Sequence, residues 1–376
     1  MTNRLRIVHC FRSPVGGIFR HVRDLTDAQV AQGHAVGIVC DSTTGGAFEE
    51  RLFDDIRPRL ALGVHRTPMQ RHIGPGDAAS AWRTYRIIKE LKPDVLHGHG
   101  AKGGTYARLF GSLLRVSRFR VARLYSPHGG SLHYDEDTAI GKLFFAIERA
   151  MSRFTDSLLF VSDYEQRAYR RKIGEPPIPN VLVYNGLLAA EFEPVPAAPD
   201  AADLLYIGMM RDLKGPDLFL DALALAEARL GRPLAAVMVG AGDDLPRYQA
   251  QAERLGLKER VRFLPPMPAR QAFALARLVV VPSRAEAMPY IVLEALAAGK
   301  PMVATSVGGI PEIFGAGSPA LVKPDADEIG GRIAAALADL DAYARLMPDA
   351  ASLKARFGAD VMAENIEGAY FAALKK

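Results

Sequence analysis

The stretch RAEAMPYIVLEALAAG, residues 284–299, has the pattern of a short helix set between two strands. Pro289 fits the first helical position, where its missing N–H costs nothing, and Gly299 fits the position after the last turn. β-branched and apolar runs at 279–281 and 302–304 flank this helix. A strand–helix–strand order of this kind is typical of a parallel sheet.

Two glutamates lie eight positions apart in this stretch, Glu286 and Glu294. We expect Glu286 in the loop before the helix and Glu294 about one turn inside it. The amides of Tyr290 and Ile291 then point out of the helix start, where an anion can bind. Carboxylates beside such an anion site suit a ligand that carries both phosphates and hydroxyls, as a nucleotide sugar does.

The same alternation runs through the chain and predicts an α/β fold with two Rossmann-like domains. In the first half, strands are expected at 5–9, 35–39, 94–97, 121–125, 157–161 and 181–184, with helices at 17–32, 78–91, 103–114, 140–152 and 164–172. In the second half, strands are expected at 204–207, 235–239, 261–264, 279–281, 302–304 and 321–322. Ligands of open parallel sheets bind at the carboxyl ends of the strands, so a cleft between the domains is the expected site.

The segment EPVPAAPDAAD, residues 193–203, is rich in Pro, Ala and Asp and is the best linker candidate. The predicted domains are therefore 1–193 and 194–352. The remaining residues, 353–376, are predicted to form a terminal helix.

Composition restricts the class of protein. The 376 residues are 49% hydrophobic and 8% aromatic, as in ordinary globular proteins, and no run of about 18 apolar residues is present. The apolar run in the first residues is too short for a signal peptide, so a cytoplasmic protein is expected. Cys10 and Cys40 are expected to be reduced thiols rather than a disulfide.

Charge is unevenly distributed. Residues 1–193 carry 27 Lys and Arg against 20 Asp and Glu, a net of +7, whereas the rest carry 20 against 22, a net of −2. The basic half could meet an anionic membrane, a lipid diphosphate or an acidic glycan. No nucleic-acid-binding motif accompanies the charge.

Several segments resemble the family 4 retaining glycosyltransferases, which have the GT-B fold with two Rossmann-like domains facing across a cleft. The spacing of Glu286 and Glu294 is similar to that family's signature. Further matching segments are SPVGGIFRHVRDL (13–25), YSPHGGSLHY (125–134), TDSLLFVSDYE (155–165), YIGMMRDLKGPDLFLDAL (206–223) and VVVPSRAEAMPYIVLEALAAGKPMVATSVGGIPEI (279–313). The resemblance therefore covers nearly the whole chain. It implies that domain 1–193 binds the acceptor and domain 194–352 the nucleotide-sugar donor, and that the helix in 353–376 crosses back onto the N-terminal domain.

The resemblance assigns roles to individual residues of the donor-binding domain. Lys214 and Arg211 would neutralise the leaving diphosphate, although the family's arginine usually directly follows the glycine, where this chain has Met209. Glu286 would accept hydrogen bonds from the transferred sugar, and Glu294 from the ribose. The loop and helix start that complete the donor site are Met288, Pro289, Tyr290 and Ile291.

In the N-terminal domain, the resemblance places Gly16 and Gly17 beside the β-phosphate and His128 close to the donor sugar. A helix is expected from about Ile18. His97 and His99 alternate along a strand end; they are interpreted as hydrogen-bonded structural histidines rather than metal ligands, since no third ligand is evident. GAGD, residues 240–243, lacks the third glycine of a dinucleotide fingerprint, which makes an NAD site improbable.

The segment 108–125 has five arginines and no acid. Leu109, Phe110, Leu113 and Leu114 are predicted to share one helical face. That face is either a membrane-docking patch or part of the core, with arginines favoured by the end of the helix dipole.

The sequence thus predicts a retaining transferase that moves a sugar from a nucleoside diphosphate sugar to a hydroxyl of a glycan or polyprenyl-diphosphate-linked acceptor. Neither a metal nor another cofactor is expected, since Arg211, Lys214 and helix-start amides would stabilise the leaving diphosphate. Cell-surface polysaccharide assembly and peripheral contact with the inner membrane are implied by resemblance. Two alternatives remain open at this point: a GT-B nucleotide-sugar epimerase, and a non-catalytic bilobal sugar- or nucleotide-binding protein.

Overall fold

The computed structural model describes residues 4–70, 77–117, 120–315 and 317–375. The chain divides into two compact units, Met1–Gly186 together with Ala359–Lys376, and Leu187–Gly358. The sequence placed its divisions at 193/194 and 352/353. The predicted linker, residues 193–203, lies inside the second unit, where Val195 N donates to Ala298 O at 2.9 Å and Ala198 N donates to Ala274 O at 2.9 Å.

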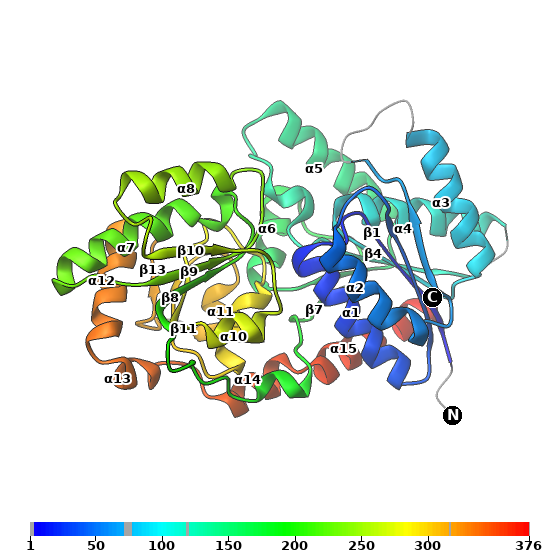
Figure 1. The fold of residues 1–376 in the computed structure, drawn as a ribbon. Coiled ribbons are helices and arrows are strands. Elements are labelled where there is room, and N and C mark those ends of the chain that lie inside the picture. Colours follow the sequence, from blue (N-terminus) through cyan, green and yellow to red (C-terminus); the bar gives the residue numbers. More distant parts are fainter. Residues whose placement is uncertain (1–3, 71–76, 118–119, 316, 376) are drawn as a thin grey trace. The chain divides into compact units, whose positions relative to one another are not determined.

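The first unit is built on a parallel seven-stranded sheet in the order β3-β2-β1-β4-β5-β6-β7 (Figure 1). Its strands are β1 Arg6–Phe11, β2 Ala35–Asp41, β3 Val64–Thr67, β4 Val95–His99, β5 Ala122–Ser126, β6 Ser157–Phe160 and β7 Asn180–Leu182. Its α-helices are α1 Gly16–Ala31, α2 Ala47–Ile56, α3 Asp77–Leu91, α4 Gly100–Val116, α5 Ala139–Met151, α6 Asp163–Lys172 and α15 Ala359–Leu374.

The second unit repeats this plan with a parallel six-stranded sheet in the order β10-β9-β8-β11-β12-β13. Its strands are β8 Ala202–Ile207, β9 Ala236–Val239, β10 Val261–Leu264, β11 Ala276–Val281, β12 Met302–Thr305 and β13 Leu321–Val322. Its α-helices are α7 Pro216–Leu230, α8 Leu245–Arg254, α9 Ala269–Ala274, α10 Tyr290–Ala297, α11 Ile310–Phe314, α12 Ala326–Ala338, α13 Leu340–Ala344 and α14 Ala350–Phe357. Two parallel-sheet units confirm the predicted α/β class.

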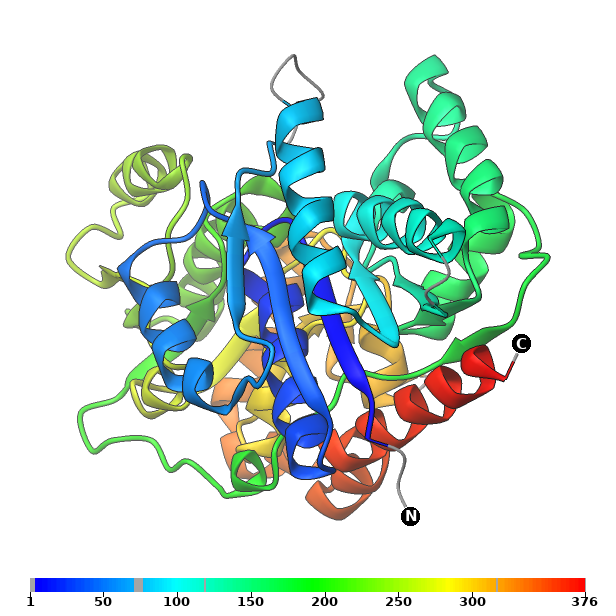
Figure 2. The ribbon, with the colours of Figure 1, turned by 90° about the vertical axis from the view of Figure 1, so that its right-hand side faces the viewer.

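The C-terminal stretch differs from the single helix that was predicted. Gly358 is extended, with φ −74° and ψ 143°, and divides the stretch into α14 and α15. Only α15 belongs to the first unit, where it packs beside α1. Figure 2 shows α15, in red, next to α1, in blue.

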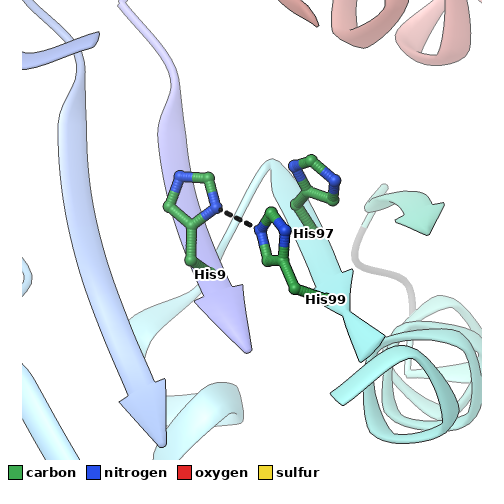
Figure 3. Close-up of side chains that lie close together, drawn as sticks. All are labelled: His9, His97 and His99. Carbon is green, nitrogen blue, oxygen red and sulfur yellow. Dashed lines mark hydrogen bonds between the residues drawn. The ribbon is translucent and has the colours of Figure 1, made fainter. Parts of the chain in front are cut away.

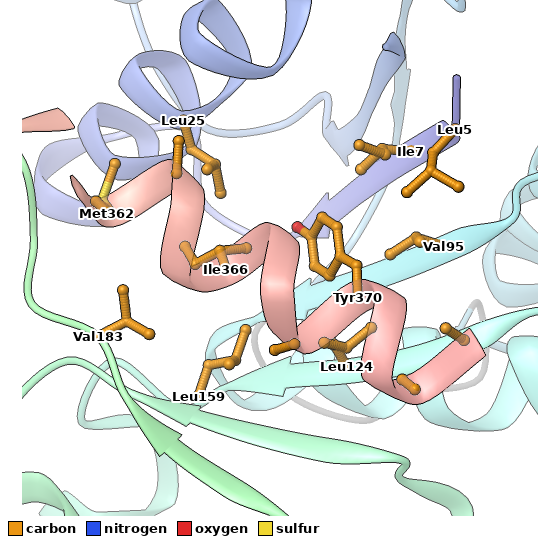
Figure 4. Close-up of a cluster of buried hydrophobic side chains, with 14 residues drawn as sticks. Leu5, Ile7, Leu25, Val95, Leu124, Leu159, Val183, Met362, Ile366 and Tyr370 are labelled. Carbon is orange, nitrogen blue, oxygen red and sulfur yellow. The ribbon is translucent and has the colours of Figure 1, made fainter. Parts of the chain in front are cut away.

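The apolar face of α15 closes one core of the first unit (Figure 4). Met362, Ile366 and Tyr370 recur every four residues, so they share one face of the helix. They pack against Leu25 of α1 and against strand residues that include Ile7. The last helix of the chain is therefore part of the same core as its first strand.

The four leucine and phenylalanine side chains of α4 do not share one face. Phe110 and Leu114 are buried, whereas Leu109 and Leu113 are exposed. Residues four apart form one row along a helix, so the pairs 109/113 and 110/114 make two neighbouring rows, and only the second faces the core. In the part of the chain that the structure describes, no helix combines the length and apolar character needed to span a bilayer.

Candidate active site

In the second unit, the loop after β8 is positioned by two glycines that follow β9. A Cβ built at Gly240 would lie 1.9 Å from the carbonyl oxygen of Gly208, and one at Gly242 would lie 2.4 Å from that of Met210. Only glycine permits so close a backbone approach. GAGD therefore packs against the loop that leads to Lys214, which gives these glycines a local structural role.

Lys214 ends a short 3-10 turn and is followed by Gly215, whose φ of +68° favours glycine. A Cβ at Gly215 would lie 2.1 Å from the carbonyl oxygen of Pro282, at the end of β11. The loops after β8 and β11 are therefore in backbone contact. Both follow the carboxyl ends of neighbouring parallel strands, which is where ligands of such sheets bind.

This contact brings together two residues that the sequence nominated. The Lys214 ammonium lies 2.6 Å from Oε1 and 2.7 Å from Oε2 of Glu286. Glu286 is buried and Lys214 is partly exposed. The two residues, 72 positions apart in the chain, form a charge-assisted pair in which each neutralises the other.

Further contacts hold Glu286 in place. Ser283 Oγ donates to its Oε1 at 2.8 Å, and Thr305 Oγ1 donates to the carbonyl oxygen of Ser283 at 2.6 Å. Gly308 has φ +60°, and a Cβ there would lie 1.6 Å from the carbonyl oxygen of Glu286. Gly308, in the 279–313 segment, thus packs against the backbone of Glu286. The sequence did not reveal this packing role.

Helix α10 begins at Tyr290, and Pro289 is its N-cap with an extended ψ of 122° rather than its first helical residue. Pro289 provides no side-chain cap for the amides of the first turn, which begins with Tyr290 and Ile291. Met288 is buried at this helix start, and Glu294 lies one turn inside, partly exposed. Gly299 follows the helix with φ +72°, as predicted.

Arg211 was predicted to contact the diphosphate, and Met209 occupies the position where the family usually has its arginine. Both residues are exposed on the loop after β8. Within the residues that the structure describes, the Arg211 guanidinium has no salt-bridge partner, whereas nearby Arg284 pairs with Asp217 at 2.5 Å. Among the described residues, then, no carboxylate pairs with the exposed charge of Arg211.

In the first unit, α1 begins at Gly16, one to two residues before its predicted start at 17 or 18. Gly16 has φ +65°, and a Cβ there would meet no atom within 4 Å. Val15, its N-cap, provides no side-chain hydrogen bond. Gly16 therefore opens the helix with an uncrowded backbone, as a close ligand approach would require, and Gly17 is the next residue of the helix.

His128 follows β5 in a turn that strains its backbone, with φ +50°. The Glu165 carboxylate accepts hydrogen bonds from the amides of Gly129 and Val161, and Ser162 Oγ accepts one from the amide of Glu165. Glu165, at the start of α6, therefore fixes the turn that holds His128.

His128 is one member of a buried histidine network. His9 of β1 and His99 of β4 are joined by a 3.0 Å hydrogen bond between Nδ1 and Nε2, drawn in Figure 3. His99 Nδ1 in turn lies 3.0 Å from His128 Nε2. His9 Nε2 meets Gln29 Oε1 at 2.8 Å. β1, β4 and β5 are neighbours in the sheet, so their carboxyl ends bring these three rings together.

The network continues through the C-terminal helix. Gln29 Nε2 donates to the Tyr370 hydroxyl at 3.2 Å, and His97 Nδ1 lies 2.8 Å from the same hydroxyl. His97 Nε2 meets Ser126 Oγ at 2.8 Å. His97 and His99 are hydrogen-bonded, as the sequence predicted, but His9 supplies the third nearby ring that the sequence did not reveal.

Burial controls the protonation of these rings. It lowers the pKa of His9 and of His21 to about 4, and it holds the pKa values of His97, His99 and His128 well below 6.5. All five imidazoles are therefore neutral at pH 7. Neutral imidazole is also the form that binds metals, and two groups of three have ring nitrogens within 4.8 Å of one another, namely His9, His97 and His99, and His21, His99 and His128.

The two thiols lie on the neighbouring strands β1 and β2. Cys10 and Cys40 are free and buried. Burial raises the pKa of Cys40 to about 12, so its thiol is protonated and unreactive at pH 7.

Comparison with known proteins assigns the chain to a family. Residues 15–188 match the model described as Glycosyltransferase Family 4, and residues 189–352 match that described as Glycosyl transferases group 1. A D-inositol 3-phosphate glycosyltransferase of Thermobispora bispora is 31% identical over 88% of this chain and 85% of its own length. The chain belongs to the family 4 glycosyltransferases. It is thus an enzyme of the hexosyltransferase type.

Solved structures confirm the GT-B fold of this glycosyltransferase. Anabaena HepE in complex with UDP-glucose has a TM-score of 0.80 and 19% identity, over 97% of this chain and 99% of its own. WaaG, a glycosyltransferase involved in lipopolysaccharide biosynthesis, has a TM-score of 0.64 and 18% identity, over 98% of each chain.

Proposed function

We propose that this family 4 enzyme transfers a sugar, with retention of configuration, from a nucleoside diphosphate sugar to a hydroxyl of a glycan or lipid-linked glycan acceptor. The paired Lys214 and Glu286 carry this proposal. Each has the chemistry for one part of the donor: the ammonium for the diphosphate, and the carboxylate for sugar hydroxyls.

The pair is set for exchange on binding. In the absence of a ligand the two charges neutralise each other, which avoids leaving the buried Glu286 carboxylate alone. A donor diphosphate would take over Lys214, and the hydroxyls of its sugar would satisfy Glu286. The amides at the start of α10 and the exposed Arg211 would add positive potential, so that no metal or other cofactor is required for the departing diphosphate. Glu294, one turn further, would accept from the ribose.

Residues of the first unit would complete the reaction. Gly16 leaves room for a phosphate or an acceptor. Gly17 would lie beside the same group, and His128 would contact the donor sugar. By resemblance to the family, retention would proceed through attack by the acceptor hydroxyl on the face that the diphosphate leaves, and a leaving phosphate oxygen would take the hydroxyl proton. Family membership favours neither the epimerase nor the binding-protein alternative.

The acceptor has a second candidate. The relative from Thermobispora bispora is named for D-inositol 3-phosphate, whereas WaaG acts in lipopolysaccharide biosynthesis. A transfer assay separates the two by offering inositol 3-phosphate and polyprenyl-diphosphate-linked glycans in parallel with each donor. UDP-glucose is the first donor to test, since HepE, of the same fold, is described with it.

The product decides the reaction class. NMR of the new glycoside should show the anomeric configuration of the donor. An inverted anomer would contradict the retaining mechanism, and a changed nucleotide sugar without any acceptor would establish the epimerase instead.

We further infer that the enzyme works in cell-surface polysaccharide assembly and contacts an anionic membrane peripherally, from the cytoplasmic side, through α5. Ile140, Leu143 and Ile147 recur along one side of this helix and are 56%, 58% and 45% exposed. The exposed charges of α5 are Lys142 and Arg149, both cationic, since Glu148 is buried against Arg108. An apolar stripe with cationic neighbours has the composition of an interfacial helix.

Vesicle binding tests this contact. Wild-type protein should sediment with phosphatidylglycerol vesicles, and the double variant Leu143→Gln/Ile147→Gln should partition at least about tenfold more weakly, because each buried aliphatic side chain contributes roughly 1.5–3 kcal/mol. Equal binding of both proteins would contradict the assignment. A concentration-dependent dimer that the variant abolishes would assign the stripe to a second copy of the chain.

A further inference from the structure

The side-chain amide of Gln29 determines which partner donates in each hydrogen bond of the histidine network. Oε1 of this amide only accepts hydrogen bonds, and its Nε2 only donates them. Oε1 faces His9 Nε2 at 2.8 Å, while Nε2 donates to the Tyr370 hydroxyl at 3.2 Å. His9 must therefore carry its hydrogen on Nε2, which leaves its Nδ1 bare.

The tautomers of the next two rings follow from that of His9. A neutral imidazole has one N–H and one accepting nitrogen. His99 must donate from Nε2 to the bare Nδ1 of His9, which leaves its own Nδ1 bare. His128 must then donate from Nε2 to His99 Nδ1. Nδ1 of His128 is the remaining nitrogen, and it carries no hydrogen.

The hydrogen bonds that run from Gln29 through Tyr370 to His97 are consistent with the same amide orientation. Tyr370 accepts from Gln29 and so has its own hydrogen available for His97 Nδ1, at 2.8 Å. His97 then carries its hydrogen on Nε2 and donates it to Ser126 Oγ at 2.8 Å. If the Gln29 amide turned over, every ring would change tautomer, and His128 would present an N–H instead of a lone pair.

We propose that Gln29 and Tyr370 are positioning residues that keep Nδ1 of His128 a bare hydrogen-bond acceptor for a substrate hydroxyl. This assignment rests on the proposed function, in which His128 contacts the donor sugar. Gln29 lies on α1 and Tyr370 on α15, 341 residues apart. The C-terminal helix thereby acts on the site through hydrogen bonds as well as through its apolar face.

The proposal competes with metal binding at the same rings. His9, His97 and His99 could bind a divalent cation only by offering one lone pair each to the same point. In the hydrogen-bond chain, the facing nitrogens of His9 and His99 share one hydrogen, which an ion would have to displace. Stoichiometric zinc binding by the purified protein would therefore overturn the proposal.

Nitrogen-15 NMR of protein labelled in its nine histidines reads the tautomers directly, with each ring assigned by its own His→Gln variant. At pH 7 we expect the Nε2–H form for His9, His97, His99 and His128. Tyr370→Phe and Gln29→Met should each replace the single His128 tautomer with a mixture. They should also lower kcat/KM about tenfold, the effect of one lost hydrogen bond.

Tyr343→Phe is the matched control, because it removes another buried tyrosine hydroxyl, bonded to the carbonyl oxygen of Met302 in the second unit. It should leave the histidine spectrum and kcat/KM unchanged. An Nδ1–H form of His128 in the wild type, or an unchanged His128 tautomer in both folded variants, would overturn the proposal. The spectra need no substrate, so they can confirm the tautomers even where the transfer assay contradicts the proposed function.

Discussion

Each unit places polar groups in or after the carboxyl-terminal halves of its parallel strands, but the two units compensate the cost of burying these groups in different ways. The first unit buries neutral imidazoles and links them by hydrogen bonds. The second unit keeps a full ammonium–carboxylate pair between Lys214 and Glu286. A neutral network is suited to hold geometry and hydrogen-bond direction, whereas an ion pair can exchange its partners for a charged ligand.

Lowering the pH should destabilise the first unit, because its buried histidines are neutral in the folded protein. The folded pKa values of His9 and His21 are about 4, below the usual 6.5, so the unfolded chain binds protons first as pH falls. The stability that these rings contribute is present above pH 6.5 and is lost between pH 6.5 and 4. The loss is about 3 kcal/mol for each ring, at 1.36 kcal/mol per pKa unit.

Denaturant unfolding at a series of pH values measures this effect. The free energy of unfolding of the first unit should fall toward pH 4 with a slope that corresponds to at least two protons. A free energy that does not change between pH 6.5 and 4 would show that the rings are already protonated in the folded protein.

Lys214→Ala should give the largest loss of activity. It removes the cation expected to stabilise the leaving diphosphate, and loss of one such group typically costs about 10²–10³ in kcat. Lys258→Ala is the control, since it removes a lysine of the same unit that pairs with Glu253 at the surface. The measurement is the transfer rate of each folded variant. Equal rates for the two variants would show that Lys214 is not part of the active site.

Gly308→Ala tests whether backbone packing places Glu286. The added Cβ would collide with the Glu286 carbonyl, so the carboxylate must shift, and a misplacement of about 1 Å can cost 10²-fold in rate. Gly256→Ala has a similar φ of +69° but no atom within 4 Å of the new Cβ. It should cost stability alone. Similar kcat values for the two variants would show that the contact with Gly308 does not position Glu286.

Arg211→Ala should have the smallest effect, about tenfold in KM for the donor, because its exposed charge acts from high dielectric. Raised ionic strength should reduce the difference from wild type. A loss as large as that of Lys214→Ala would instead place the guanidinium in direct contact with the diphosphate.

The sequence predicted most strands because buried parallel strands are continuous apolar runs, as in RIVHCF of β1 and ARLVVV of β11. It missed β3, whose VHRT is short and half polar at the sheet edge, and α2, where four of ten residues are acidic. Gly358 was not recognised as the break between α14 and α15. A lone glycine inside a helical pattern does not reveal whether the helix ends there.

The candidate site was predictable where chemistry and spacing coincide, as for Lys214, Glu286 and His128. The contacts that position these residues were not. Gly308 meets Glu286 only through the fold, and Gln29 meets Tyr370 across 341 residues. The histidine network left one signal in the sequence. Histidines stand at or just after the ends of three predicted strands: His9, His97 with His99, and His128. Strand order, which the sequence does not state, brings them together.

The most direct test of the account is calorimetric titration of the wild type and of Lys214→Ala with UDP, GDP, ADP and CDP. We predict that one of these nucleotides binds the wild type and that its affinity falls at least about tenfold in the variant, as expected for one lost charge-assisted contact. Binding of none of them, or equal affinity for both proteins, would contradict a nucleoside diphosphate sugar site built on Lys214 and Glu286.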